Sequence, residues 1–487
     1  MRLIFGNDGN GETCQRIPFF QLSGDGLPAK NLAWCAQSIA ERPPCLGNLP
    51  GNGITDNADN SSAIPTTILQ KKTINFRLAI ICMAAASVGL SMVIISIAKF
   101  LLLICAVATL LLAPQASGVG KRLAGTVTPA AVLVVLFAFS LSLFWTVAPQ
   151  AEALGSLAKY SKLIVIILMM ALIRDRREAI YALAAFLLAQ AFLLVSSWLL
   201  FAHLPVPWAT SNMALTQNAV FSSYLDQGII SAVSAAICWH LRDLFPGRFG
   251  RQVAIILAVV ALLNVFFVLI GRSGHVVAIA LLSIAIMWEL PKRYRAAVVL
   301  LPFLLALGLF FSSSKVRERL TLVETEVQSY SPQAATITSS GVRLVFWQSA
   351  IQIIAQHPLA GAGIGSWSSE YNRIRRETNP AHVDIDGNGN PHQEYLLWGV
   401  QLGIPGIFLL CALMFSMLMD SRKMEKHCAR AIQSTLLALA VACLFNASLY
   451  DAQIGDFFCV SLGLLLAFGL TKNSRPAHAT TSPEPAT

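Results

Sequence analysis

Charged residues are scarce in this sequence. Asp, Glu, Lys and Arg make up 12% of the 487 residues, whereas soluble globular domains carry about 25%. Hydrophobic residues make up 55%, and the mean hydropathy is +0.64. This composition excludes a soluble globular protein and predicts a membrane protein that crosses the bilayer several times.

The motifs of several common activities are also absent. The sequence contains no GxSxG, HExxH or P-loop motif, and no GxGxxG in a strand-turn-helix setting. Its ten Cys show neither CxxC nor metal-ligand spacing. The common hydrolase and nucleotide-binding classes therefore have no support, and we predict neither a cofactor nor a bound metal.

Acidic residues are outnumbered by basic ones. The chain has 35 Lys or Arg and 25 Asp or Glu, which gives a net charge of +10. A basic excess can indicate a polyanionic partner, but here it lies in short segments between apolar runs, as the positive-inside rule predicts. We therefore infer membrane orientation from it and predict no nucleic-acid partner.

The apolar runs predict an all-α polytopic membrane protein with about twelve transmembrane helices. Several runs fall short of the ~20 residues that cross the hydrocarbon, so flanking residues should complete them or the bilayer should thin locally. The runs lie at 78–95, 97–113, 129–146, 158–173, 179–201, 227–241, 253–270, 275–290, 296–312, 395–418, 431–450 and 455–470.

The remaining segments complete the predicted domain organisation. Residues 1–72 are rich in Gly, Asn and Pro, and no apolar stretch in them is long enough for a signal sequence or a span. We predict that this segment is disordered. A gene-model extension is the alternative, although no Met lies between Met1 and Met83. We then predict helices one to nine in 73–312, a long, partly helical periplasmic loop in 313–394, helices ten to twelve in 395–470, and a disordered cytoplasmic tail in 471–487.

Basic segments follow every even-numbered span, which places both termini in the cytoplasm. Lys159 and Lys162 are exceptions, because they lie at the outer side of the fourth span. The segments are Lys121/Arg122, Arg174/Arg176/Arg177, Arg242/Arg248/Arg251, Lys292/Arg293/Arg295, Arg422/Lys423/Lys426/Arg430 and Lys472/Arg475.

The long outer loop contains a predicted helix. Residues 343–357 have apolar side chains at 344, 347, 351 and 354, the spacing of a helix with one apolar face. The stretch HPLAGAGIGSW that follows supplies glycines for a compact turn. We expect this helix to lie on the membrane surface or against the spans.

The stretch DIDGNGNPHQEYLLWGVQLGIPG, residues 384–406, joins this loop to an apolar helix. Asn390 can cap the helix, Pro391 suits its first position, and Gln393 can bond back to the free amides. His392 would then lie in the first turn, where the dipole attracts anions and disfavours a protonated imidazole. A neutral His beside an anion site can act as a general base.

Two arginines are the main candidates for binding the anion. Arg272 lies in GRSGH between two spans, where Gly271 and Gly274 leave room for close approach, and a guanidinium fork suits a diphosphate. Lipid phosphate contact is the alternative. Arg343 opens the loop helix, where a cation is unfavourable, so a partner should hold it: either a substrate or Glu324 or Glu326.

Other polar clusters have weaker support. Arg373, Arg375 and Arg376 form a group that is more typical of a solvated face than of an anion site. Residues 384–389 resemble the opening of a calcium loop, but Tyr395 occupies the position that needs a Glu. A Gly/Asn-rich turn is the better interpretation of this stretch.

Three stretches together resemble the O-antigen ligase and O-antigen polymerase family of bacterial polytopic glycosyltransferases. They are GRSGH, then RLVFWQSAIQIIAQHPLAGAGIGSWSSEY, and then NPHQEYLLWGVQLGIPG, which resembles the family pattern His-(Asn/Gln/Ser)-x9-Gly-x-x-Gly at His392, Gln393, Gly403 and Gly406. The resemblance covers about 78–470. Ligases of this family tend to carry a further Arg in the outer loop after the fifth span, and this chain has none there.

The resemblance implies a GT-C-like membrane fold and a metal-independent, inverting transfer. The donor would be a glycan on undecaprenyl diphosphate, and the acceptor the lipid A-core oligosaccharide at the periplasmic face of the inner membrane. By analogy, His392 would be the base and Arg272 would bind the diphosphate. Arg343, as the hypothetical second cation, and Gln393 are assigned to substrate binding.

Three other functions stay open at this point. An O-antigen polymerase, or a transferase that glycosylates a pilin or other protein, would use the same base and diphosphate site with another acceptor. A flippase or other transporter of lipid-linked glycans belongs to a different class. A transporter predicts ionisable residues inside the spans, whereas the residues singled out above lie at their outer ends.

Overall fold

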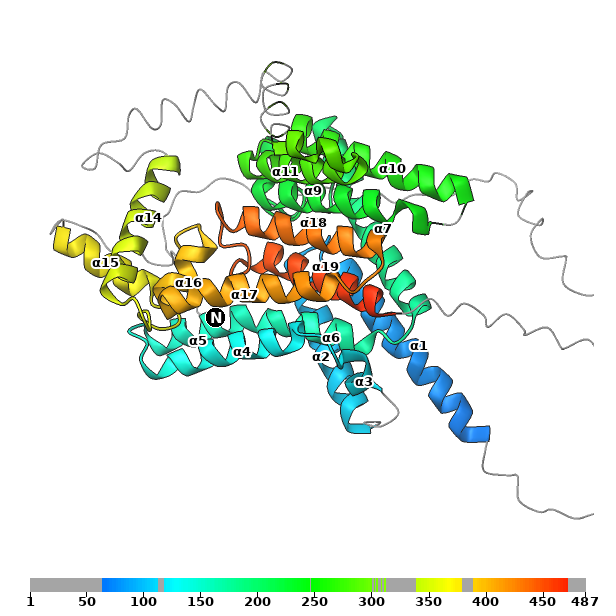
Figure 1. The fold of residues 1–487 in the computed structure, drawn as a ribbon, viewed down its shortest axis with the longest axis horizontal. Coiled ribbons are helices and arrows are strands. Elements are labelled where there is room, and N and C mark those ends of the chain that lie inside the picture. The colour runs from blue at the N-terminus through cyan, green and yellow to red at the C-terminus, as the bar shows by residue number, and fades with distance from the viewer. Residues whose placement is uncertain are drawn as a thin grey trace, which may run out of the picture. The chain divides into compact units, whose positions relative to one another are not determined.

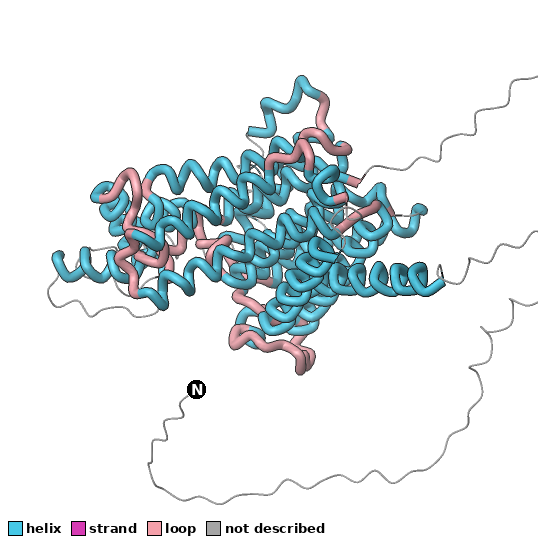
Figure 2. Tube along the Cα trace, turned by 90° about the horizontal axis from the view of Figure 1, so that it is seen from below, coloured by secondary structure: helices cyan, strands magenta, loops and turns pink. Residues whose placement is uncertain are grey.

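The computed structural model describes residues 64–112, 118–245, 247–299, 302, 304, 308, 311, 339–378 and 389–471. Every regular element in these ranges is helical, and no strand occurs among them (Figure 1; Figure 2). The prediction of an all-α protein is therefore confirmed. The elements are α1 (Ile64–Ser87), α2 (Met92–Leu112), α3 (Val119–Leu123), α4 (Thr128–Leu141), η1 (Ser142–Phe144), α5 (Gln150–Tyr160), η2 (Ser161–Leu163), α6 (Ile164–Leu172), α7 (Arg176–Phe201), α8 (Ala214–Gln217), α9 (Tyr224–Leu241), η3 (Arg242–Leu244), α10 (Gly247–Leu263), η4 (Asn264–Val268), α11 (Arg272–Glu289), η5 (Lys292–Val299), α14 (Ser339–Gln356), α15 (Trp367–Thr378), α16 (Glu394–Leu402), α17 (Ile404–Ser421), α18 (Lys426–Ala442) and α19 (Ala452–Leu470).

The described part contains seven helices that are long and apolar enough to cross a membrane. The prediction of a polytopic membrane protein is therefore confirmed. Two shorter apolar helices accompany these seven, and α9 and α18 coincide with two more of the predicted spans. The predicted span at 296–312 lies largely outside the described residues, so the total of twelve stays a prediction. The seven are Met92–Thr109, Gln150–Leu172, Arg176–Phe201, Gly247–Val268, Arg272–Glu289, Ile404–Ser421 and Ala452–Leu470.

The first helix corrects one predicted boundary. Helix α1 begins at Ile64, so the disorder predicted for residues 1–72 does not extend over 64–72, and residues 1–63 lie outside the described part. A turn separates α1 from α2 at Gly89, where a Cβ would lie 3.0 Å from the Ala189 carbonyl oxygen. The turn therefore depends on the close approach of α7.

Two predicted spans are shorter in the structure than in the sequence analysis. The run 395–418 is two helices, α16 and α17, which meet at Gly403 with a φ of +71°. The glycine-rich turn packs against this break, since a Cβ on Gly361 would lie 2.5 Å from the Gly403 nitrogen. The run 431–450 contains α18 only as far as Ala442, and residues 443–451 connect α18 to α19.

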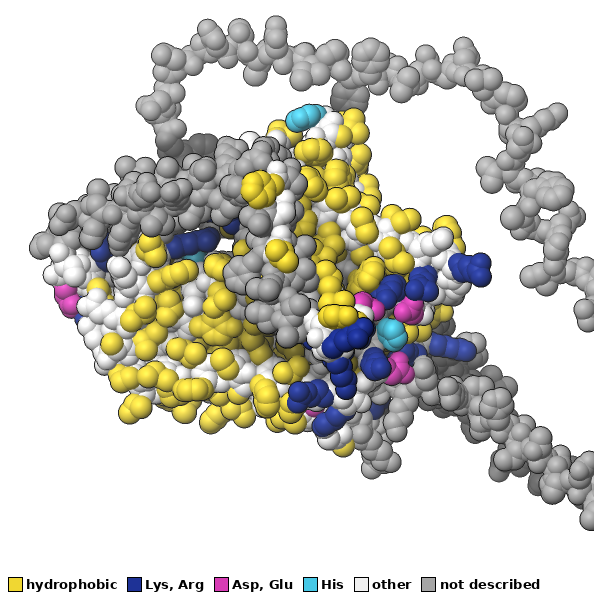
Figure 3. Space-filling model, turned by 45° about the horizontal axis from the view of Figure 1, so that its top comes forward, with side chains coloured by type: hydrophobic (Ala, Val, Ile, Leu, Met, Phe, Trp, Pro, Cys, Tyr) yellow, Lys and Arg dark blue, Asp and Glu magenta, His cyan; other side chains and the backbone are white. Residues whose placement is uncertain are grey.

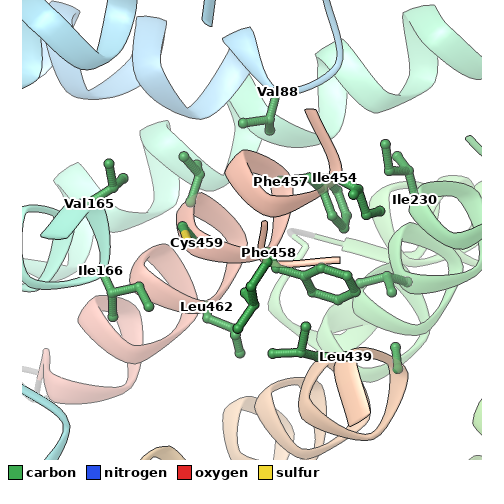
Figure 4. Close-up of a cluster of buried hydrophobic side chains, with 14 of the residues drawn as sticks. Val88, Val165, Ile166, Ile230, Leu439, Ile454, Phe457, Phe458, Cys459 and Leu462 are labelled. Atoms are coloured by element: carbon green, nitrogen blue, oxygen red, sulfur yellow. The ribbon is translucent and has the colours of Figure 1, made fainter. Parts of the chain in front are cut away.

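Helix α19 lies at the centre of the packing. Its aromatic and aliphatic side chains Ile454, Phe457 and Phe458 are fully buried. Figure 4 shows them among side chains from three other helices and a turn: Val165 and Ile166 of α6, Ile230 of α9, Leu439 of α18, and Val88 in the turn after α1. Because α19 is enclosed on all these sides, the neighbouring helices are fixed relative to one another.

Charged side chains within the apolar helices are paired. Lys99 of α2 contacts Asp456 of α19 at 2.7 Å, and Arg77 of α1 pairs with Glu178 of α7. Pairing offsets the cost of burying each charge. Lys99 and Asp456 are therefore ionisable residues within spans, a pair that the sequence did not single out.

Most of the predicted basic segments meet at one end of these helices. Glu289, at the end of α11, contacts Arg242 at 3.6 Å and Arg430 at 3.4 Å, while Arg176 contacts Glu425 at 3.2 Å. Figure 3 shows Lys and Arg side chains gathered beside a broad hydrophobic surface. Helix α18 starts at this end with Lys426, and its 17 residues extend for about 25 Å. The loop after α18 is therefore at the opposite end.

Candidate functional site

The structure places His392 just before helix α16. The N-cap of α16 is Gln393, whose side-chain oxygen accepts a hydrogen bond from the Leu396 amide. The prediction that Asn390 caps this helix and that His392 lies in its first turn is therefore wrong. Instead, the Asn390 side-chain oxygen accepts a hydrogen bond from the His392 amide at 2.8 Å. His392 has a left-handed φ of 54°, which a non-glycine residue keeps only when its surroundings impose it.

Glu394 connects this segment to the loop 443–451. The side chain is fully buried, and its Oε2 accepts hydrogen bonds from the amides of Leu449 at 2.8 Å and Tyr450 at 3.2 Å. Its Oε1 accepts from the Trp398 indole at 2.7 Å, and its amide donates to the Cys443 carbonyl at 2.9 Å. Glu394 therefore holds the loop against the start of α16, and its oxygens are already engaged.

The loop 443–451 brings polar side chains to His392. The Asn446 side chain lies close enough to the imidazole to raise its pKa as a hydrogen-bond partner, and its Nδ2 donates to the Asp226 Oδ1 on α9 at 3.5 Å. Asp451 accepts from the Asn390 Nδ2 at 3.1 Å, and Asn446 helps to lower the pKa of Asp451. Helix α9, the segment before α16 and the loop after α18 thus meet around one imidazole.

Arg343 of α14 connects His392 electrostatically with Arg272 of α11. Burial lowers the pKa of Arg343, and the positive charge of Arg272 lowers it further. The positive charge of Arg343 in turn lowers the pKa of His392. Arg343 therefore lies within electrostatic reach of both the second guanidinium and the imidazole. Like charges held together in this way favour an anion that bears more than one negative charge.

Close helix packing positions Arg272. A Cβ on Gly274 would lie 3.0 Å from the Gly228 Cα, and one on Gly271 would lie 3.2 Å from the Tyr224 carbonyl oxygen. These glycines let α11 begin directly against α9, the helix that carries Asp226. Gly271 and Gly274 were predicted to leave room for close approach to Arg272. In the structure, helix α9 occupies the room beside both glycines.

The electrostatics around His392 favour its neutral form. Burial lowers the pKa of the imidazole, Arg343 lowers it further, and the hydrogen bond with Asn446 acts in the opposite direction. The imidazole therefore stays neutral at pH values where a solvated His begins to take up a proton. The sequence analysis predicted a neutral His392 from a helix dipole, but burial and a neighbouring arginine are the causes.

The loop helix α14 forms one wall of the site with a face that differs in part from the predicted one. Of the predicted positions, Trp347 and Ile354 pack against the core, whereas Ile351 is 58% exposed, so the prediction is wrong at Ile351. The fully buried side chains are instead Phe346, Ala350 and Ile353. The Phe346 ring stacks on the His392 ring with 6.2 Å between the ring centres. The Trp347 indole donates a hydrogen bond to the Pro391 carbonyl at 3.2 Å. Helix α14 thus packs directly against the segment that carries His392.

The other predicted polar clusters do not join the site. Arg373 of α15 forms salt bridges with Glu370 at 2.6 Å and Glu377 at 2.8 Å, as expected for the solvated-face interpretation. Asp384 and Asp386 lie outside the described residues. The Gln393 side-chain oxygen is used in capping, so only its amide nitrogen remains for the substrate contact that the sequence predicted.

The loop 443–451 is supported by the two exceptions to the basic pattern, Lys159 and Lys162. The Lys162 ammonium donates to the Asp451 carbonyl at 2.7 Å and to the Tyr450 carbonyl at 3.3 Å. The Lys159 ammonium lies 4.0 Å from the centre of the Tyr450 ring. Both cations favour the ionised form of Asp451, the pKa of which is raised by burial.

A comparison with known families agrees with this arrangement. Residues 256–411 match the family model described as O-antigen ligase. This match supports the O-antigen ligase family that the resemblance in the sequence implied. No curated protein matches the chain. The O-antigen ligase match indicates an enzyme that transfers glycans, of the ligase or polymerase type.

The region matched to the O-antigen ligase model contains Arg272, Arg343 and His392. Asp226 precedes this region, and Asn446 and Asp451 follow it. Sequence reasoning missed these three residues because Asn446 was placed inside the run 431–450, and because Asp226 and Asp451 adjoin apolar runs and were treated as the ends of spans. An ionisable or amide side chain at the boundary of an apolar run is the signal that could have found them.

Proposed function

We propose that this protein transfers O-antigen glycan from undecaprenyl diphosphate to the lipid A-core oligosaccharide. In this proposal His392 is the general base, and Arg272 and Arg343 bind the diphosphate. Gln393 contributes its side-chain amide to substrate binding. The family match supports glycan transfer in general, and the donor, the acceptor and these residue roles are our inference.

The proposed reaction is a single displacement. An acceptor hydroxyl gives its proton to the imidazole as its oxygen attacks the anomeric carbon of the donor. The bond between that carbon and the diphosphate oxygen breaks, and undecaprenyl diphosphate leaves with the electron pair. Attack opposite the leaving group inverts the anomeric carbon. Negative charge increases on the departing diphosphate, where fixed guanidiniums stabilise it most.

The observation that carries the proposal is the position of Arg343, which acts both on the neutral imidazole of His392 and on the second guanidinium, that of Arg272. A base must be unprotonated at working pH, and burial and Arg343 both lower the pKa of His392. The mutual repulsion of Arg272 and Arg343 is relieved by a ligand with at least two negative charges, as a diphosphate has.

The position of the site relative to the basic segments supports a periplasmic reaction. Helices α9, α11 and α18 each have one end near His392 and the other among the basic side chains. Under the positive-inside rule the basic end is cytoplasmic, so His392 would face the periplasm. Donor and acceptor would then meet at the outer surface of the inner membrane.

Replacement of His392 by Ala tests the proposal. The purified variant should lose transfer from undecaprenyl-diphosphate glycan to core lipopolysaccharide by about 10²-fold or more, because a general base contributes about 10²–10⁴-fold. The matched control is His357→Ala, since His357 is an exposed His at the end of α14. Unchanged transfer by His392→Ala at equal protein level would refute the catalytic role.

The choice of acceptor needs a separate comparison. The wild-type protein would be given the same donor with core lipopolysaccharide, with a second carrier-linked glycan, or with a pilin. Transfer to the core supports the proposed ligase, whereas transfer only to the carrier-linked glycan or the pilin identifies a polymerase or a protein transferase. Transfer to none of them would favour a transporter.

A further inference from the structure

Asn446 occupies a position that the base mechanism does not yet use. It lies in the loop 443–451, which Glu394 holds through the amides of Leu449 and Tyr450. Its side chain contacts His392 on one side and two carboxylates, Asp226 and Asp451, on the other. These partners lie on α9, in the segment before α16 and in the loop 443–451 itself, so the amide lies between three separate parts of the chain.

The two carboxylates determine which way the amide points. A side-chain amide has one acceptor oxygen and two N–H donors, whereas an ionised carboxylate only accepts hydrogen bonds. The Asn446 Nδ2 donates to the Asp226 Oδ1, although burial and Asp451 raise the pKa of Asp226 to about 7. The ionised acceptor that fixes the amide is therefore Asp451, and the Asn446 Nδ2 carries the only donors that can serve it. Lys159 and Lys162 favour the ionised form of Asp451. The Asn446 oxygen is therefore directed towards His392.

This orientation selects one tautomer of the imidazole. A neutral imidazole carries one N–H and one bare nitrogen, and the partner of the N–H fixes which nitrogen is which. Because the Asn446 oxygen can only accept, the ring nitrogen that faces it must carry the hydrogen. The other ring nitrogen is then bare, as a base requires.

An amide suits this position better than a carboxylate would. A carboxylate hydrogen-bonded to an imidazole stabilises the protonated ring and raises its pKa by about one unit or more. The amide holds the ring in place without adding charge. Asp226 and Asp451 lie one side chain further from the ring, where they fix the amide rather than the imidazole.

We propose that Asn446, held by Asp226 and Asp451, is a positioning residue that accepts the His392 N–H and leaves the second ring nitrogen free to take the proton of the acceptor hydroxyl. The inference rests on the proposed function, because it assigns a purpose to the bare nitrogen. The charged and titratable groups that face this arrangement are Arg343 of α14, Arg272 of α11, Tyr224 and Asp226 of α9, Asp451 of the loop, and Lys159 and Lys162 behind it.

Nitrogen NMR tests the tautomer without any transfer reaction. The full-length protein would be labelled with ¹⁵N-histidine in nanodiscs, and the His392 signals identified by their loss in His392→Ala. In the wild-type protein one ring nitrogen should be protonated and the other bare. Asn446→Ala should give averaged shifts from two tautomers, while Leu444→Ala, a change of an exposed side chain in the same loop, should not. An unaltered His392 spectrum in Asn446→Ala would overturn the proposal.

The pH dependence of transfer gives a second, independent readout. Asn446→Asp should move the acidic limb of the kcat/KM profile upward by about one unit, since a carboxylate stabilises the imidazolium. Asn446→Ala should lower kcat about tenfold or more with little change in KM for the donor. If Asn446→Asp leaves the limb in place while His392→Ala abolishes transfer, the positioning role is wrong and the base is right. If His392→Ala keeps its activity, the base is wrong, and the NMR result still decides the tautomer.

Discussion

Glu394 offers the sharpest test of how the site is held together. Its carboxylate is fully buried and accepts hydrogen bonds at 3.2 Å or less from two loop amides and an indole. Glu394→Ala removes the acceptor from all three donors. A buried donor that loses its acceptor costs about 1–3 kcal/mol, and neighbouring losses are not additive, so we expect a destabilisation of about 3–5 kcal/mol.

The stability of the folded protein in detergent measures this loss. The midpoint of denaturant unfolding should fall for Glu394→Ala, and hydrogen exchange at the amides of Leu449 and Tyr450 should accelerate. Glu394→Gln keeps one side-chain oxygen as an acceptor, so it should lower the unfolding free energy less than Glu394→Ala does. Glu152→Ala, at an exposed acid of α5, should change stability by at most about 0.5 kcal/mol. Unaltered exchange at Leu449 and Tyr450 in Glu394→Ala would refute the view that this side chain holds the loop.

Two further predictions concern the arginines of the site. Arg343→Gln removes a positive charge that lowers the pKa of His392, so the acidic limb of the kcat/KM profile should move to higher pH; a limb that stays in place would show that the two groups do not interact. Gly274→Val should force α11 away from α9, because a Cβ there would lie 3.0 Å from the Gly228 Cα. We expect a loss of about 1–3 kcal/mol in unfolding free energy and a higher KM for the donor as Arg272 moves, with Gly308→Val as the control, since a Cβ there meets nothing within 4 Å. Equal effects of the two Gly variants would contradict the packing argument.

The apolar runs predicted where the helices are but not where two of them end. Residues 443–450 and the break at Gly403 continue the apolar runs of the neighbouring helices, because they are mostly buried and several of their amides bond to other parts of the chain. The Glu394 carboxylate accepts hydrogen bonds from the amides of Leu449 and Tyr450. The Pro358 carbonyl accepts one from the Ile404 amide at 2.8 Å. Hydropathy cannot distinguish such a segment from a helix, since both satisfy their backbone groups inside the protein.

The cap of α16 shows how local signals compete. Asn390 and Gln393 can both accept hydrogen bonds from helix amides, and the sequence favours Asn390 at this position. In the structure the Asn390 side chain bonds to the His392 amide and to Asp451, so Gln393 takes the cap. The position of His392 near the site could be predicted from the motif, whereas its left-handed backbone depended on contacts with residues some 60 positions later in the chain, as the separation of 61 between Asn390 and Asp451 shows.

The two lysines that break the basic pattern favour the ionised form of Asp451. Burial and the charge of Asp451 raise the pKa of Asp226 to about 7, as expected when two buried carboxylates are neighbours. Lys162 bonds to the carbonyls of Tyr450 and Asp451, and Lys159 lies over the Tyr450 ring, so their positive charges act on Asp451. A cation on the outer side goes against the positive-inside pattern, and in this chain it coincides with the structure that orients the proposed base. Exceptions to that pattern in a polytopic sequence are therefore worth examining as supports of a site before they are assigned to lipid.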